Sequence, residues 1–262
     1  MRRYFGLLWV QLRTSLVLAA QYRWDFLLEG LVSLAWIALG VVPLYVALHQ
    51  RPPAFGWTYE QALVVVGWFT LLKAVLDGAV TPSLNTVVEH IRKGTLDFVL
   101  LKPADAQFLV STARFEPWRA VDLAAGIGIV AWAFHLMGTV PRGADVAVSC
   151  FLLGAAVAVL YSVWILVVAA AFWVVRLDNL SYLLNSVIDF ARWPVHVFKG
   201  TLRIVFTFVV PLALMTTYPA EALLGRLAAR TAALAVLGSL AFSLAGRLVW
   251  TRAIGRYTSA SS

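Results

Sequence analysis

The sequence predicts an all-α membrane protein with six transmembrane helices. Of its 262 residues, 61% are hydrophobic and only 13% are charged, and the charged residues are concentrated between long apolar runs. Soluble domains carry about 25% charged residues, whereas a run of about 20 apolar residues can cross a bilayer as a helix. Eleven Trp and eight Tyr suit anchoring at the level of the lipid headgroups. We expect residues 1–262 to form a single transmembrane domain.

Residues 1–23 are predicted to form an amphipathic helix on the cytoplasmic membrane surface. The segment is apolar but contains four arginines, which would face the headgroups while Phe5 and Trp9 enter the apolar region. A cleavable signal peptide is the alternative, because a basic start precedes an apolar stretch. Arg13 interrupts that stretch, which favours the interfacial helix.

Six apolar runs follow and are assigned to membrane spans. They lie at about residues 26–48, 59–80, 121–137, 146–175, 180–191 and 231–250. Small residues in the third run (Gly126 and Gly128) and in the fourth (Gly154, Ala158 and Ser162) favour close packing between helices.

The second span contains two charged residues, Lys73 and Asp77. They are four residues apart and therefore share one helix face. A charge inside a span is costly, so such residues usually pair with each other or face a water-filled path. Two interpretations stay open: a structural ion pair, or an ion-coupling pair in a transport pathway.

Residues 83–118 form the longest charged interruption and are predicted to be a cytoplasmic loop. The loop begins with an amphipathic helix in which Glu89 precedes Arg92 and Lys93 by three and four residues, a spacing that suits ion pairing. Gly94 stands where a helix C-terminus favours a residue that can adopt positive φ.

Three bulky apolar residues, Leu96, Phe98 and Leu100, follow this helix. A short helix that ends in such an apolar knuckle, between two membrane spans, is suited to docking onto a soluble partner. The alternative is a solvated loop with an ordinary interfacial helix.

The segment 192–225 does not have the pattern of a simple span. It contains three cations and is interrupted by helix-breaking residues, namely Pro194, Gly200, Pro211 and Pro219. Irregular backbone at membrane depth persists only where protein or water covers it. We therefore predict a hairpin of two broken, partly re-entrant helices between spans five and six. Arg192, His196, Lys199 and Arg203 are spaced to stack on one face of a helix within it.

The distribution of Arg and Lys favours an orientation with both termini in the cytoplasm. The two short outer loops contain only Arg51 and Arg142, and the five basic residues of the hairpin region weaken this bias without reversing it. The net charge of +8 is explained by this orientation and by contact with anionic lipids, not by nucleic acid. Seventeen Arg against four Lys suggest a GC-rich bacterial genome, so we expect the inner membrane of a bacterium.

The segment Glu89…Arg92-Lys93-Gly94-Thr95-Leu96-Asp97…Leu100-Leu101-Lys102-Pro103 resembles the cytoplasmic coupling segment of type-2 ABC exporter permeases. That segment follows the pattern E-x-x-R/K-x-G-T-L-E-x-L-L-x-x-P and precedes a helix that rests in a groove of the ATPase subunit. Asp97 replaces the commoner Glu, and the spacing before the proline differs slightly. The resemblance implies that the ATPase-docking residues are Glu89, Arg92, Lys93, Gly94, Thr95, Leu96, Asp97, Phe98 and Leu100.

The hairpin carries a second resemblance to the same permeases. Arg192-Trp193-Pro194, followed by Phe208-Val209-Val210-Pro211 and by Tyr218-Pro219-Ala220, is similar to their extracytoplasmic hairpin, which ends in an N/Y-P-x-x-x-L motif. One hypothesis is an exit gate for an anionic or amphiphilic substrate, formed by Arg192, Lys199, Arg203, Tyr218 and Glu221. The alternative is anchoring by snorkelling cations.

The resemblance implies a permease subunit of an ATP-driven exporter. The chain would form the pathway with a second permease, as a homodimer or, as in many relatives of this size, a heterodimer, and would dock on a dimer of separate ATPase subunits. It contains no G-x-x-x-x-G-K-[ST], H-E-x-x-H or G-x-S-x-G motif, so we expect no enzyme activity, metal site or cofactor in this chain, and ATP with Mg²⁺ in its partner. The rivals are an ion-coupled secondary transporter that uses Lys73 and Asp77, and a membrane scaffold.

Overall fold

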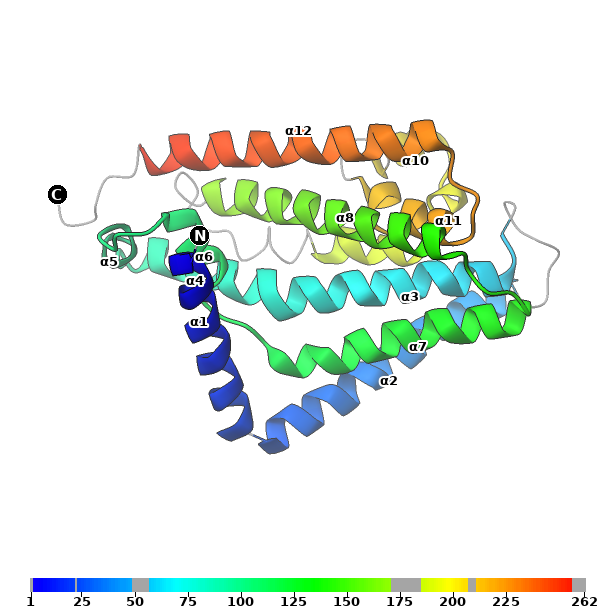
Figure 1. Cartoon of the computed structure of the whole chain (residues 1–262), viewed down its shortest axis with the longest axis horizontal. Coiled ribbons are helices and arrows are strands. Elements are labelled where there is room, and N and C mark those ends of the chain that lie inside the picture. Colours follow the sequence, from blue (N-terminus) through cyan, green and yellow to red (C-terminus); the bar gives the residue numbers. More distant parts are fainter. Residues whose placement is uncertain (1, 22, 49–56, 171–184, 207–210, 256–262) are drawn as a thin grey trace.

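The structure is a computed structural model that describes residues 2–21, 23–48, 57–170, 185–206 and 211–255 (Figure 1). This part of the chain is helical and contains no strand. Five helical segments within it are long and apolar enough to cross a membrane: Trp24–Val46, Tyr59–Ile91, Pro117–Met137, Gly143–Ala169 and Ala229–Ile254. Residues 180–184 of the predicted fifth span, 180–191, lie outside the described residues, so the count of six stays a prediction.

The long helices lie side by side along the long axis of the molecule (Figure 1). They are α2 (Arg23–Leu48), α3 (Tyr59–Val75) with its continuation α4 (Thr81–Arg92), α7 (Ala120–Met137), α8 (Gly143–Ala170) and α12 (Ala229–Ile254). Large fully buried side chains, among them Leu72 of α3 and Trp164 of α8, form the core between these helices.

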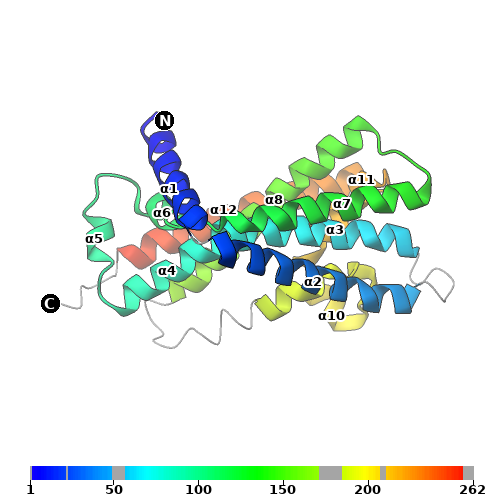
Figure 2. The same cartoon turned by 90° about the horizontal axis from the view of Figure 1, so that it is seen from below.

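The first helix, α1 (Arg2–Gln21), crosses one end of this bundle at a steep angle (Figures 1 and 2). Ser15 Oγ of α1 accepts a hydrogen bond from Phe115 N at 3.2 Å, which fixes the helix to the loop between α4 and α7. This position suits the predicted interfacial helix, while its contact with a membrane stays a prediction.

One continuous helix covers the predicted second span and the amphipathic helix that follows it. The π-helical turn η1 (Leu76–Val80) joins α3 to α4. Pro82 has no N–H to donate to Gly78 O four residues earlier, and that oxygen instead accepts from Glu116 N at 2.8 Å. A π-helical turn of this kind is frequent at functional sites.

The loop after α4 is built from short helices: α5 (Asp97–Leu100), α6 (Ala106–Ser111) and the 3₁₀ turn η2 (Pro117–Arg119). Gly94 ends α4 with φ of 66°, as predicted, and the neighbouring Thr95 N donates to His90 O at 2.9 Å. The predicted pair between Lys93 and Glu89 is confirmed, with Nζ and Oε2 3.4 Å apart.

Helices α3 and α7 make a very close crossing at two glycines. A Cβ added to Gly126 would lie 2.8 Å from Leu71 Cγ and 3.1 Å from Gly67 O. A Cβ added to Gly128 would meet no atom of the described residues within 4 Å. The prediction of close packing is therefore confirmed for Gly126 and wrong for Gly128.

Helices α8 and α12 pack through small residues. A Cβ added to Gly246 would lie 3.1 Å from Ser162 Cβ, and Ser162 Oγ is 3.5 Å from Ser243 Oγ. Gly154, in the same predicted stripe as Ser162, has open space where a Cβ would be, as far as the described residues show. Of these small residues in the fourth predicted span, Ser162 therefore lies in the contact between α8 and α12, whereas Gly154 does not.

The hairpin region is broken into short pieces at the end of the bundle opposite to α5 (Figure 1). They are η3 (Asp189–Arg192), η4 (Val195–Val197), α10 (Gly200–Ile204), the π-helical η6 (Ala213–Thr217) and α11 (Tyr218–Leu223). The predicted single basic helix face is wrong, because Trp193, Phe198 and Lys199 are extended. Pro194 and the positive φ of Gly200 explain the breaks.

Candidate functional site

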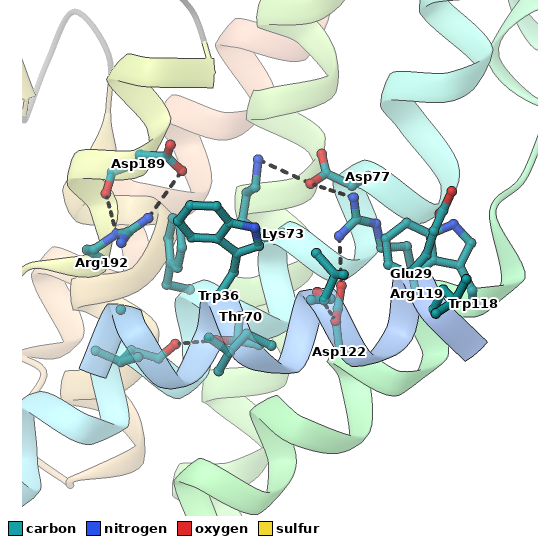
Figure 3. Close-up of a pocket in the computed structure, with 17 residues that line it drawn as sticks. Glu29, Trp36, Thr70, Lys73, Asp77, Trp118, Arg119, Asp122, Asp189 and Arg192 are labelled. Carbon is teal, nitrogen blue, oxygen red and sulfur yellow. Dashed lines mark hydrogen bonds and ion pairs between the residues drawn. The ribbon is translucent and has the colours of Figure 1, made fainter. Parts of the chain in front are cut away.

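A cavity of about 670 Å³ lies between α2, α3, the start of α7 and η3 (Figure 3). Its walls are largely apolar and include Trp36 of α2 and Phe69 of α3. Seven charged side chains also line it, namely Glu29, Lys73, Asp77, Arg119, Asp122, Asp189 and Arg192. A drug-sized molecule requires a cavity of about this size.

The predicted ion pair in the second span is confirmed and lines this cavity. Lys73 Nζ lies 3.2 Å from Asp77 Oδ2. Asp77 is shared, because the same oxygen is 3.7 Å from Arg119 Nη2 (Figure 3). The side chains of Lys73, Asp77 and Arg119 are all mostly buried. Burying any of these charges without an oppositely charged partner would be destabilising.

Arg119 is the functional side chain that sequence reasoning missed. It bridges Asp77 to Asp122, whose Oδ2 accepts from Arg119 Nη1 at 2.9 Å, and Ser33 Oγ of α2 donates to the other oxygen of Asp122. The network therefore joins α2, α3 and α7. The one available signal was the three-residue spacing of Arg119 and Asp122 at the start of a span.

Arg192 and Asp189 form the far end of the cavity (Figure 3). Arg192 Nη2 lies 3.6 Å from Asp189 Oδ1, and the guanidinium carbon is 5.3 Å from the centroid of the Phe69 ring. Each of the three cations in the cavity thus has a carboxylate partner. Glu29 is exposed and has no ion pair within the described residues, so four carboxylates against three cations leave one negative charge in excess.

A short stretch before α7, residues 114–119, connects this cavity to the loop at the end of the bundle; we call it the return limb. Ser83 Oγ donates to Arg114 O at 2.6 Å and accepts from Arg114 N at 3.0 Å. Glu116 N donates to Gly78 O. These bonds fix the return limb to η1 and α4, and the limb ends at Arg119 inside the cavity.

The sequence of this chain matches the family model of ABC-2 family transporter proteins over residues 34–261. The chain belongs to the ABC-2 transporter family. No curated protein and no solved structure matches it. Members of this family are the membrane subunits of transporters, are not themselves catalytic and generally work with an ATPase subunit. The recognised resemblance to type-2 ABC permeases is thereby confirmed.

The predicted docking residues of this ABC-2 permease lie at the end of the bundle, in α4, α5 and the turn between them. Leu96 is fully buried in the core of the chain itself, whereas Phe98 is 70% exposed. Leu101 is 81% exposed and lies on the same side of this helical turn, three residues later. The exposed apolar surface of this segment is therefore Phe98 with Leu101, and Leu96 fixes the segment to the core.

Among the predicted gate residues with described side chains, Arg192 and Glu221 lie in different surroundings. Arg192 lines the cavity, whereas Glu221 of α11 lies with its Oε1 3.9 Å from His196 Nε2. Lys199 is exposed, and the side chain of Arg203 lies outside the described atoms. Among the described residues, no group of three or more His, Cys, Asp or Glu side chains could hold a metal ion.

Proposed function

We propose that this chain is the permease subunit of an ATP-driven exporter. It forms the translocation pathway together with a second permease and docks on a separate ATPase subunit. The cavity between α2, α3, α7 and η3 is part of that pathway. ATP and Mg²⁺ bind to the partner, and this chain carries out no hydrolysis.

The single observation that supports this proposal best is the return limb. One end of the limb belongs to the loop that carries the exposed Phe98 and Leu101, and its other end places Arg119 between Asp77 and Asp122. A displacement of the loop by an ATPase would therefore move a cation within the cavity. Such a mechanical connection is needed by a subunit that transports but does not hydrolyse ATP.

The exposed side of α2 supports a second permease as partner. Large apolar side chains there are uncovered, among them Leu31, Trp36 and Leu39. Because the cavity is bordered by the same helix, a second copy or a related permease would complete its wall. We propose a dimer of permeases in a bacterial inner membrane, with both termini in the cytoplasm. The end of α12 and the start of α1 lie toward the same end of the bundle as α5, which fits this orientation (Figure 1).

An exit gate at the opposite end of the bundle is part of the proposal. Lys199 directly precedes α10, Arg203 belongs to α10, and Tyr218 and Glu221 belong to α11. Lys199 and Arg203 changed together to Gln would leave assembly with the ATPase intact and abolish export if they contact the substrate. Unchanged export would leave anchoring in the membrane as their role.

The docking proposal is tested by purifying the tagged chain from its native membrane and measuring the bound ATPase subunit by mass spectrometry and ATP hydrolysis. Burial of one large apolar side chain contributes about 1.5–3 kcal/mol. Changing Phe98 and Leu101 together to Asp removes about 3–6 kcal/mol, which weakens binding roughly 100-fold or more. Val140→Asp, which alters an 89% exposed residue at the opposite end of the bundle, is the matched control. Full ATPase retention by the double variant would contradict docking at this surface.

An ion-coupled transporter is the second candidate, because Lys73 and Asp77 line the cavity. The two functions differ in their energy source. An ATP-driven exporter loses transport when the partner ATPase is inactivated and keeps it when an ionophore collapses the ion gradients. The opposite pattern would favour ion coupling by Lys73 and Asp77.

A further inference from the structure

We call the loop between α4 and α7 the docking loop, because it carries the proposed docking surface. Besides the return limb, it has a second attachment to the bundle, at α6. Asp105 caps this helix, with Oδ1 accepting from Phe108 N at 2.9 Å. The same carboxylate accepts a two-pronged contact from Arg247 of α12, with Nη2 at 2.7 Å from Oδ2 and Nη1 at 3.4 Å from Oδ1. The Asp105 backbone N donates to the hydroxyl of Tyr4 at 3.2 Å. One residue therefore connects α6 to both α1 and α12.

Neighbouring polar groups extend this contact to α8. Gln107 Oε1 also accepts from Arg247 Nη1, and Gln107 Nε2 donates to the Tyr161 hydroxyl at 2.9 Å. Ser111 Oγ lies 2.7 Å from the same hydroxyl. We call Asp105, Gln107, Ser111, Tyr161 and Arg247 the α6 clamp. Paired guanidinium–carboxylate contacts are strong and fix orientation as well as distance.

The location of Arg247 argues for a specific role. Of the three arginines in α12, Arg230 and Arg252 lie at its ends, whereas Arg247 lies seven residues before Ile254. That is about 10 Å along the helix axis, among exposed apolar residues such as Leu248. Arg247 thus lies within the candidate membrane span Ala229–Ile254, and a cation inside a span is costly unless it is paired. Asp105 supplies the pair, and the hydrogen bond from Arg247 holds the pKa of Asp105 below its usual value.

We propose that Arg247 is a positioning residue that ties the last span to the docking loop, so that α6 and α12 move as one body. The inference rests on the proposed function for the source of the movement. The return limb passes a displacement of the loop to the cavity, and the α6 clamp passes it to α12 and, through the Gly246–Ser162 packing, to α8. The α3–α7 pair and the α8–α12 pair then both respond to the docking of one ATPase subunit.

The rigid link is tested first on the permease by itself, which separates it from the docking proposal. Spin labels are placed at Lys102→Cys and Leu244→Cys, both exposed, with Cys150→Ser as background. Labelled chains are diluted with unlabelled chain, and the distance distribution is measured by double electron–electron resonance. We expect a narrow distribution that broadens when Arg247→Met is added. An unchanged distribution would overturn the proposal.

Three further variants distinguish a positioning role from general damage. Arg247→Lys keeps the charge and should restore much of the narrow distribution. Asp105→Asn retains a good helix cap and loses the charge, so it should broaden the distribution even if Arg247→Met does not fold. Arg252→Met, which removes an exposed arginine from the same helix, should leave it narrow. Equal broadening by Arg252→Met would also contradict the proposal.

The movement itself is tested in the complex with its ATPase. A reporter Arg230→Cys at the far end of α12 is treated with a membrane-impermeant maleimide, with and without ATP and vanadate. We expect the nucleotide to change the reaction rate in the parent and in Arg252→Met, and this change to be lost in Arg247→Met. ATPase must stay bound in all three. An equal response in Arg247→Met would show that α12 moves without the clamp.

Discussion

The close crossing of α3 and α7 supports a quantitative prediction. Gly126 and Gly128 lie two residues apart on α7, yet only the Cβ of Gly126→Ala would collide, 2.8 Å from Leu71 Cγ and 3.1 Å from Gly67 O. The backbone oxygen cannot rotate away, so α3 and α7 must separate. The same alanine at Gly128 meets open space within the described residues. The two substitutions are therefore a matched pair that differs in the contact and not in the chemistry.

The expected magnitude follows from two opposing contributions. Replacing Gly by Ala within a helix stabilises by about 0.5–1 kcal/mol through reduced backbone entropy of the unfolded chain. Overpacking costs typically about 1–3 kcal/mol. The helical contribution is common to both variants, so Gly126→Ala should be less stable than Gly128→Ala by about 1–3 kcal/mol.

The assay is thermal unfolding of both purified variants and the parent in one detergent. Gly128→Ala should melt at or slightly above the parent temperature, and Gly126→Ala several degrees below it. Because α3 and α7 carry Lys73 and Asp122, two residues that line the cavity, the cavity should also widen, which is measurable as faster labelling of a cysteine placed at Thr70. Equal melting temperatures for the two alanine variants would refute the close crossing.

Three further predictions follow from the charges and the topology. Asp77→Leu leaves Lys73 without its carboxylate and removes one of the two carboxylates that Arg119 contacts, so it should lower the melting temperature more than Lys73→Met does. The double change should be milder than Asp77→Leu alone, and the reverse order would argue against the shared carboxylate. The pKa of Asp105 is lowered in the folded protein, so the contribution of its carboxylate to stability is complete above the pKa of the unfolded state and is lost as pH falls through the pKa of the folded state. The melting temperature of Asp105→Asn should therefore lie below that of the parent by a constant amount above about pH 5, and this difference should shrink below about pH 4. A difference independent of pH would contradict the ion pair. Ala144→Cys, in a background without the native cysteine, should react with an impermeant thiol reagent in intact cells, and reaction only after the membrane is opened would invert the proposed orientation.

Local spacing predicted the features that depend on neighbours in the chain. The Lys73–Asp77 and Glu89–Lys93 pairs are four residues apart on one helix, and the positive φ of Gly94 follows from its place after an amphipathic helix. Each of these depends on helix geometry alone. Such geometry is independent of how the helices pack, which explains why the sequence sufficed.

Side chains that act across the fold could not be found in this way. Arg119 reaches Asp77 from 42 residues later, and Arg247 reaches Asp105 from 142 residues later. Neither pair has a periodic signal, because the helix packing brings the partners together. The predicted single basic face of the hairpin failed for a different reason: the spacing of its cations was helical, but Pro194 and Gly200 do not permit a continuous helix.

Pro82 has a consequence for how firmly the docking loop is held. In a helix, each backbone carbonyl normally accepts a hydrogen bond from the N–H four residues later. A loop N–H that binds such a carbonyl therefore competes with that helical N–H. Pro82 removes that competitor from Gly78 O, so Glu116 N meets an acceptor that the helix cannot reclaim through this residue. Because Pro82 has no N–H, the hydrogen bond from Glu116 N that fixes the return limb to the helix has no competitor at this residue. Pro82→Ala would return an N–H to the helical register, and the limb would then be in competition for the oxygen it now binds.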